Sequence, residues 1–107
     1  LNVCVQVNLD KEKSKSGIDL EEVDDFLLEI QNLDNLTVRG LMVIPKPKDN
    51  EKQRLSFKKI KNKFYELKKN YNGLDTLSMG MSADYQEAIA EGSTMIRIGT
   101  NLFGPRQ

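Results

Sequence analysis

Histidine is absent from the 107 residues, and cysteine occurs only once, at Cys4. A single cysteine cannot form a disulfide within the chain, and without histidine it cannot complete a zinc site, so no metal is expected. No apolar run approaches the roughly 20 residues that a membrane-spanning helix needs, so no membrane partner is expected. Because Cys4 alternates with valines, we expect it to be a small buried side chain. These absences together favour a cytoplasmic location.

The sequence begins with Leu1 rather than with methionine and opens directly in a strand-like pattern, so we expect no signal peptide in it. The composition, 38% hydrophobic and 30% charged, is that of a globular protein. Its length suits one small domain or part of a larger one. We therefore expect the chain to be a piece of a longer protein.

The formal net charge is zero, but the charges are unevenly distributed. Residues 46–69 carry ten Lys or Arg against three Asp or Glu, while the rest of the chain carries six cations against thirteen anions. Such a basic block can form an interaction module for nucleic acid. No aromatic side chains are arranged to stack on bases, so the pattern favours a solvated helix face and no nucleic-acid partner.

Apolar periodicity predicts four strands that alternate with three helices. The strands are expected over residues 1–9, 37–44, 76–80 and 95–99, and the helices after Asp19, after Asn50 and over residues 83–91. Asp19 and Glu22 have the spacing of a capping box for the first helix. Five apolar residues step by three and four along the second helix: Phe57, Ile60, Phe64, Leu67 and Tyr71.

This alternation predicts an α/β fold with a parallel sheet and outer helices. An open doubly wound sheet and part of a (β/α)8 TIM barrel both fit the order of elements. Polar residues inside the first strand, such as Gln6 and Asn8, favour the barrel, whose interior narrows to a functional mouth. Four strands, or about four βα units, are half of the eight that a barrel needs.

Two of the predicted strands end in glycine followed by a hydroxyl residue, as Gly80-Met81-Ser82 and Gly99-Thr100. Ligands of parallel α/β folds collect at this end of the strands. Glycine lets backbone N–H groups approach a ligand, and Ser82 is expected at the N-cap of the short helix, where anions bind. The pattern suggests a phosphate site. The alternative is that Ser82 merely caps its helix.

A lone arginine, Arg97, interrupts the apolar fourth strand. If Arg97 points outward from the strand, its neighbours Ile96 and Ile98 must face inward. An arginine that simply points to solvent from a marginal strand is the alternative. Because Arg97 occurs together with two strand ends that carry hydroxyl residues, the pattern favours a ligand-binding site.

Residues 77–104, with the sequence LSMGMSADYQEAIAEGSTMIRIGTNLFG, resemble the end of the pyridoxal phosphate homeostasis proteins. The segments KSKSG (residues 13–17) and RGLMVIP (residues 39–45) carry the same resemblance, which covers nearly the whole chain. It implies that residues 1–107 are the C-terminal half of a single barrel domain that binds pyridoxal 5'-phosphate (PLP) and is similar to the alanine racemase N-terminal domain. The N-terminal half would be absent from this chain.

The resemblance also implies residue roles, none of them catalytic. Ser82 would bind the cofactor phosphate through its hydroxyl, and Gly99 and Thr100 would bind it through backbone N–H groups and the Thr100 hydroxyl. Arg97 would face the pyridine nitrogen. A permanent positive charge there disfavours protonation of the ring, which then is a poorer electron sink. The implied function is PLP homeostasis by carriage and delivery, without turnover.

The chain also departs from the family. The lysine that forms the family's Schiff base lies on the first strand of the barrel and is not in this chain, since Lys13 and Lys15 match no such motif. Ile44 stands where related racemases carry histidine. The expected partners are PLP and either the missing N-terminal half or a second copy of the chain. A racemase-like or phosphosugar-binding enzyme, with its acid/base residue in the missing half, is the alternative function. Met79 and Met81 are expected in the core.

Overall fold

The computed structural model describes residues 1–11 and 16–97. Gly99 and Thr100, the two lysines Lys13 and Lys15, and the end of the fourth predicted strand lie outside the described residues. The strands are β1 (Asn2–Val7), β2 (Thr37–Val43), β3 (Thr76–Met81) and β4 (Met95–Arg97). The helices are the 3₁₀ turn η1 (Leu20–Glu22), α1 (Val23–Ile30), α2 (Asn50–Lys68) and α3 (Tyr85–Ala90).

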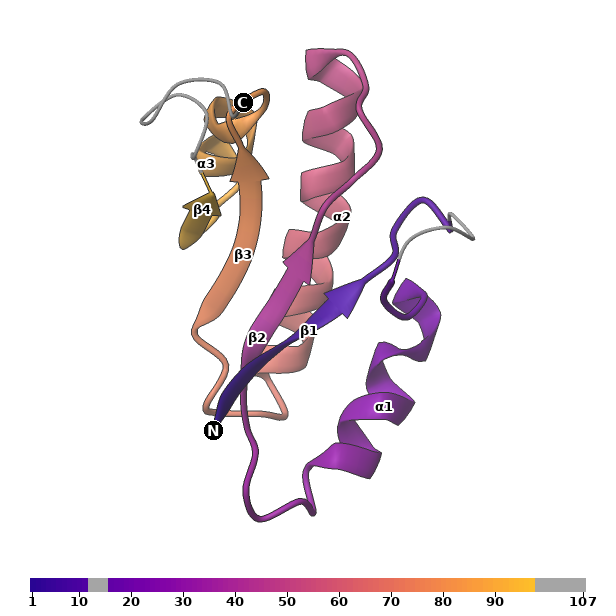
Figure 1. The fold of residues 1–107 in the computed structure, drawn as a ribbon, viewed down its shortest axis with the longest axis vertical. Helices are drawn as coiled ribbons and strands as arrows, with labels where there is room; N and C mark the ends of the chain where they lie inside the picture. The colour runs from indigo at the N-terminus through magenta and orange to yellow at the C-terminus, as the bar shows by residue number, and fades with distance from the viewer. Residues whose placement is uncertain (12–15, 98–107) are drawn as a thin grey trace, which may run out of the picture.

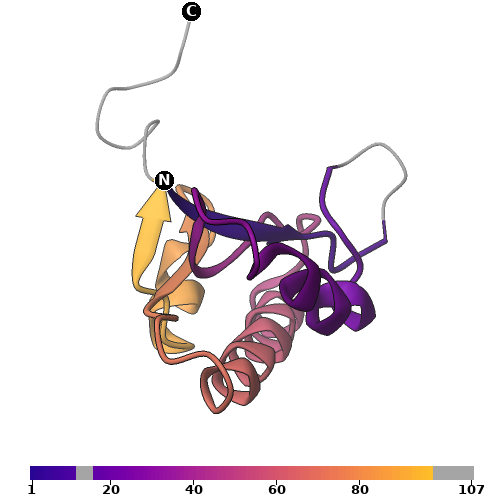
Figure 2. The same cartoon turned by 90° about the horizontal axis from the view of Figure 1, so that it is seen from below.

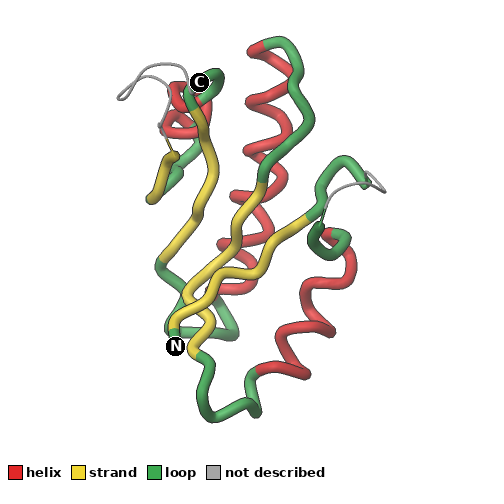
Figure 3. Tube along the Cα trace, viewed as in Figure 1, coloured by secondary structure: helices red, strands yellow, loops and turns green. Residues whose placement is uncertain are grey.

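The four strands form one parallel sheet in the order β1-β2-β3-β4, which confirms the predicted α/β fold. Neighbours in the sequence are neighbours in the sheet, as in successive βα units of a barrel. The carboxyl ends of β2 and β3 point to the top of Figure 1, where α2 also begins. Figure 3 shows the connecting loops gathered at this end and at the opposite one.

One face of the sheet packs against the helices. Figure 2 shows α1 and α2 together on the same side of the strands. The predicted stripe of α2 is confirmed for its first four members, each at most 3% exposed, and half-buried Tyr71 follows the helix end. The strand residues buried with this stripe are Val5, Val7, Leu41, Val43, Leu77 and Met79. Burial of this apolar area supplies the main driving force for the fold.

The other face of the sheet is not covered by the described helices. The prediction that Cys4 is buried is therefore wrong, because Cys4 alternates with the buried Val5 and points to the uncovered side. Met42 on β2 is only partly buried, and Ile44, just past the end of β2, is 36% exposed. The strand pattern was identified correctly, and a half barrel that lacks its partner strands is expected to leave an inner face with residues such as Cys4, Met42 and Ile44 uncovered.

Helix ends differ from the sequence prediction by a few residues. Asp49, not Asn50, caps α2, because its carboxylate accepts the backbone N–H of Lys52 at 2.9 Å. At the first helix, the Asp19 backbone N–H donates to the Glu22 carboxylate at 3.2 Å, as the predicted capping box requires. Within residues 1–11 and 16–97, no helix is long and apolar enough to cross a membrane.

A buried carboxylate ties α3 to α2. The Glu91 side chain, only 6% exposed, accepts from Arg54 Nη2 at 2.9 Å and from Lys61 Nζ at 3.0 Å. The Lys61 ammonium, followed by the Arg54 guanidinium, holds the pKa of the Glu91 carboxyl below its ordinary value. Two cations of the basic block thus stabilise the packing of α2, and Lys63 is likewise paired with Asp24 of α1.

We expect Glu91→Gln to lower the free energy of unfolding at neutral pH by about 1–2 kcal/mol, since Arg54 and Lys61 are partly exposed and regain water. A depressed pKa gives stability that is complete above the unfolded value of about 4.3 and is lost as pH falls through the lower folded value. The difference from wild type should therefore shrink between pH 6 and about 3. Urea unfolding at fixed protein concentration measures it.

The exposed Glu29 of α1 provides a matched control. Glu29→Gln should leave the free energy of unfolding close to wild type throughout the titration. A Glu91→Gln deficit that stays constant from pH 6 to 3 would show that the Glu91 charge does not stabilise the fold.

Candidate functional site

The carboxyl ends of β3 and β4 lie side by side. The parallel register pairs Met81 with Arg97, so Ser82, one residue further along, leaves the sheet next to the end of β4. The structure thus brings Ser82 and Arg97, two of the four predicted site residues, to the same end of neighbouring strands. Gly99 and Thr100 lie beyond the described residues, and their roles stay predictions.

Ser82 is not the N-cap of the short helix, which corrects the sequence prediction. Residues 82–84 form a turn, α3 begins at Tyr85, and Asp84 holds the cap position. The Asp84 carboxylate accepts the backbone N–H of Met81 at 2.8 Å through Oδ1 and the Gln53 side-chain amide at 2.6 Å through Oδ2. These two bonds of the Asp84 carboxylate hold residues 82–84 in the turn. Ser82 therefore lies in a turn and not at the N-terminus of a helix.

Gly80 has a packing role that the sequence argument did not anticipate. Its φ of +107° is strained for any residue with a side chain. A Cβ there would lie 2.7 Å from Ala88 Cβ and 3.0 Å from Ile96 Cγ2. Gly80 therefore permits a bulge in β3 and close packing of α3 and β4. Met79 is buried as expected, whereas Met81 is 42% exposed and does not belong to the core.

Arg97 turns onto the face of the sheet that the helices leave uncovered. Its Nη1 donates to the hydroxyl of Ser78 on β3 at 2.8 Å, and its Nη2 donates to the backbone carbonyl of Val43 on β2 at 3.4 Å. Ile96, the preceding residue, lies on the helix side of the sheet, where its Cγ2 and the Cβ of Ala88 both flank Gly80. The alternative that Arg97 points to solvent does not hold.

The partners of Arg97 are uncharged. Among residues 1–11 and 16–97 no carboxylate forms an ion pair with it, although Arg39, Arg54 and several lysines of the same part of the chain have such pairs. Ser78 is 4% exposed and Arg97 is half-buried. A partly desolvated guanidinium without a counter-charge attracts an anion or a lone pair strongly.

Two hydroxyl residues that the sequence analysis did not single out hold the three-residue strand β4 in place. The Ser93 hydroxyl donates to the carbonyl of Met79 at 2.6 Å, and the Leu77 backbone N–H donates to the Thr94 hydroxyl at 2.7 Å. Gly92 at φ +92° ends α3 with the bonds of a Schellman motif. The Gly-Ser-Thr run after the short helix was the available signal for this anchor.

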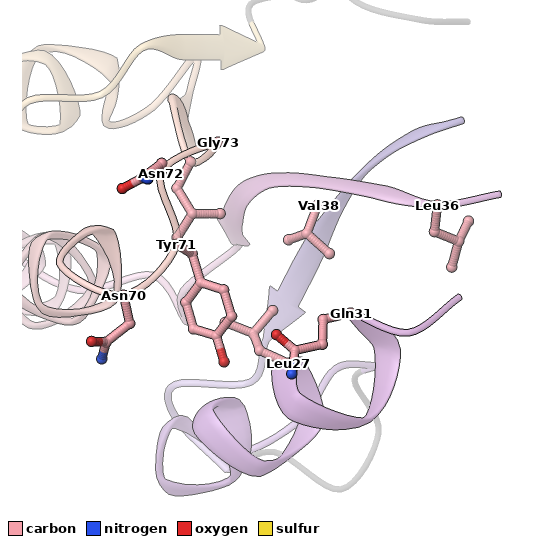
Figure 4. Close-up of a pocket in the computed structure, with 9 residues that line it drawn as sticks. Leu27, Gln31, Leu36, Val38, Asn70, Tyr71, Asn72 and Gly73 are labelled. Atoms are coloured by element: carbon pink, nitrogen blue, oxygen red, sulfur yellow. The ribbon is translucent and has the colours of Figure 1, made fainter. Parts of the chain in front are cut away.

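A pocket of about 340 Å³ lies at the opposite end of the sheet, between α1 and the loop after α2 (Figure 4). The ring of Tyr71 points toward α1 there. Its lining residues carry no formal charge: Leu27, Gln31, Leu36, Val38, Asn70, Tyr71, Asn72, Gly73 and Leu74. An anionic ligand would find no cation here, and this end of parallel strands serves stability rather than chemistry. No group of metal-ligating side chains occurs in the described ranges.

The chain is similar to known proteins in both sequence and structure. Residues 1–107 match the sequence profile of the family described as alanine racemase, N-terminal domain. The pyridoxal phosphate homeostasis protein of Escherichia coli K12 is 46% identical over 107 residues, which are 99% of this chain and 46% of that protein. PipY of Synechococcus elongatus PCC7942 superposes with a TM-score of 0.88 without PLP and 0.83 with PLP bound.

Each PipY match is 36% identical and covers 96% of this chain and 49% of PipY. The chain therefore spans about half the length of these relatives. The comparisons confirm the resemblance that the sequence motifs carried.

The Asp84 turn yields a test of how the site is held. Asp84→Ala leaves the Met81 N–H and the buried Gln53 amide without their acceptor, so the free energy of unfolding should fall by about 1–3 kcal/mol. Asp84→Asn should cost less. The other Gln53 amide atom, Oε1, has no hydrogen-bond partner among the described residues, and a flipped Gln53 can accept from the new amide.

Chemical denaturation of both Asp84 variants and wild type measures these losses. Equal losses in the two variants would show that the Asp84 charge, and not its two acceptor atoms, holds the turn.

Proposed function

This chain belongs to the family of the alanine racemase N-terminal domain, and from that premise we propose that it binds PLP as the C-terminal half of a single barrel domain. The relatives support the ligand, because one group is named for pyridoxal phosphate homeostasis and one solved structure holds PLP. The barrel half is supported by the parallel sheet and by the coverage of about half of each relative.

The observation that carries the proposal is the guanidinium of Arg97, which lies on the uncovered face of the sheet and has no carboxylate partner among the described residues. PLP combines a phosphate dianion with a pyridine nitrogen that accepts a hydrogen bond. The residues present fit it. Arg97 has five N–H donors, of which the contacts to Ser78 and Val43 use two.

In this proposal each residue of the site has a defined role in binding PLP. Ser82, with Gly99 and Thr100, holds the phosphate through hydroxyl and backbone N–H donors at the carboxyl ends of β3 and β4. Arg97 directs its guanidinium at the ring nitrogen and disfavours a proton there, because two positive charges would then be adjacent. When bound, PLP supplies an aldehyde that condenses with amines and a ring that withdraws electrons.

We further propose that the protein carries and delivers PLP without turning over a substrate. An arginine at the ring nitrogen limits electron withdrawal, which suits storage better than carbanion chemistry. The names of the relatives also favour homeostasis over a racemase-like or phosphosugar-binding enzyme. The cytoplasm is the proposed location, because a chain with a single cysteine, which can form no internal disulfide, suits a reducing compartment.

A second set of four strands is the proposed partner. The uncovered sheet face exposes Cys4. Among the described residues, the outer edge of β4 has no neighbouring strand, and the outer edge of β1 is paired only through an isolated bridge between Val7 and Ile18. Such edges and faces favour association. An N-terminal half, in the same protein or as a separate chain, would close the barrel. A second copy of this chain is the alternative occupant.

Ser82→Ala and Arg97→Gln test the function in the PLP-loaded protein that contains this chain. Ser82→Ala removes one donor to a charged oxygen, worth about 1.5–3 kcal/mol. PLP release should become roughly ten- to a hundredfold faster. Arg97→Gln should change the absorption spectrum of bound PLP more than its affinity. Stopped-flow transfer of PLP to an excess acceptor, together with the spectra, measures both effects.

Thr37, exposed at the amino end of β2, gives a control variant at the far end of the sheet. Thr37→Ala should change neither release nor spectrum. Unchanged release in Ser82→Ala together with an unchanged spectrum in Arg97→Gln would remove the site assignment.

A further inference from the structure

The side chain of Arg97 is held by a buried hydroxyl and a backbone carbonyl. Ser78 Oγ accepts from Nη1 at 2.8 Å, and the Val43 carbonyl oxygen accepts from Nη2 at 3.4 Å. These acceptors belong to β3 and β2, so the guanidinium of β4 reaches across two neighbouring strands. Contacts to both terminal nitrogens fix the plane of the guanidinium as well as its position.

We propose that Ser78 is a positioning residue that aims Arg97 at the ring nitrogen of PLP, an inference that rests on the proposed function. Ser78 contacts Arg97, and Arg97 contacts the cofactor. Its role is to hold the guanidinium plane so that the remaining N–H donors face the ligand.

A hydroxyl suits this task because it orients the Arg97 guanidinium without neutralising its positive charge. A carboxylate at position 78 would form an ion pair with Arg97 and cancel the charge that keeps the ring nitrogen unprotonated. With an apolar residue at position 78, the flexible side chain of Arg97, which has three or more rotatable bonds, would be anchored only by its longer contact to the Val43 carbonyl. Serine at this position therefore preserves both the direction and the full charge of the guanidinium.

The burial of Ser78 supports a specific role. Its neighbours along β3, Leu77 and Met79, are core residues on the helix side, whereas Ser78 faces the uncovered side and is still only 4% exposed. Burial of a hydroxyl is costly unless the hydroxyl is hydrogen-bonded, and the charge-assisted bond from Arg97 both compensates for the burial of Ser78 and fixes the guanidinium. Ser93 supplies the matched comparison, because its hydroxyl also bonds to β3 but does not contact Arg97 among the described residues.

The test uses PLP labelled with ¹⁵N at the ring nitrogen, bound to the protein that contains this chain. The ¹⁵N chemical shift followed against pH gives the pH midpoint of ring protonation. The variants are Ser78→Ala, Ser78→Thr, Ser78→Asp, Arg97→Gln and Ser93→Ala. Thermal unfolding of each variant reports the purely structural cost.

Ser78→Ala should raise the midpoint by about 0.5–1 pH unit, which corresponds to a unit charge retreating by roughly 1 Å at an effective dielectric of about 20. Ser78→Asp should raise it further, toward the value of Arg97→Gln, and Ser78→Thr should restore the wild-type midpoint. Ser93→Ala should lower the unfolding temperature at least as much as Ser78→Ala but move the midpoint clearly less, because it loosens β4 without removing a contact of the guanidinium itself.

A midpoint that moves in Arg97→Gln but stays at the wild-type value in Ser78→Ala would overturn the positioning role and leave the proposed function intact. Equal shifts in Ser78→Ala and Ser93→Ala would also overturn it, because they would reflect general loosening of β4. Failure of the wild-type protein to bind PLP would overturn both proposals.

Discussion

Helices cover one face of the parallel sheet, and the placement of the candidate site follows from that asymmetry. The alternation of strand side chains commits Val5, Leu41 and Leu77 to the helix side. Residues of the opposite phase, from Cys4 to Ser78 and Arg97, are then placed on a second face. In an isolated open sheet this face would be a liability, whereas in a barrel it is the interior.

The same asymmetry explains how a three-residue strand can hold Arg97 in a defined position. β4 is too short to be held by its ladder alone, and hydroxyls of Ser93 and Thr94 attach it to β3 before the strand begins. Gly80 then allows α3 and Ile96 to approach closely on the helix side. The backbone of β4 is thus fixed by contacts on the helix side. On the uncovered side, two neutral acceptors, the Ser78 hydroxyl and the Val43 carbonyl, orient the Arg97 side chain.

Most of the fold could be predicted from the sequence because it depends on periodicity. The alternation in the first strand and the stripe of α2 identified both elements and their buried faces. Helix caps were less certain, since Asp49 and Asn50 are both good caps and only the backbone geometry distinguishes them.

The site was harder to predict, because a sequence pattern does not reveal what covers a sheet face or which side chain holds a turn. Cys4 was expected to be buried, which assumes a cover that the described helices do not provide. Ser82 was expected to cap α3, but Asp84, with its acceptors turned toward Met81 and Gln53, takes that position. The contact between Ser78 and Arg97 joins residues 19 positions apart, and it depends on the β3–β4 register that the bulge sets.

The central claim is that this four-stranded unit is half of a barrel, and sedimentation of the 107-residue chain tests it most directly. The account predicts that the chain alone is dimeric or aggregated, because the uncovered face and the largely unpaired outer edges of β1 and β4, as far as the described residues extend, favour association. Addition of an N-terminal half should replace this self-association with a closed monomer. A well-folded monomer at micromolar concentration, with cooperative unfolding that does not depend on concentration, would contradict the claim.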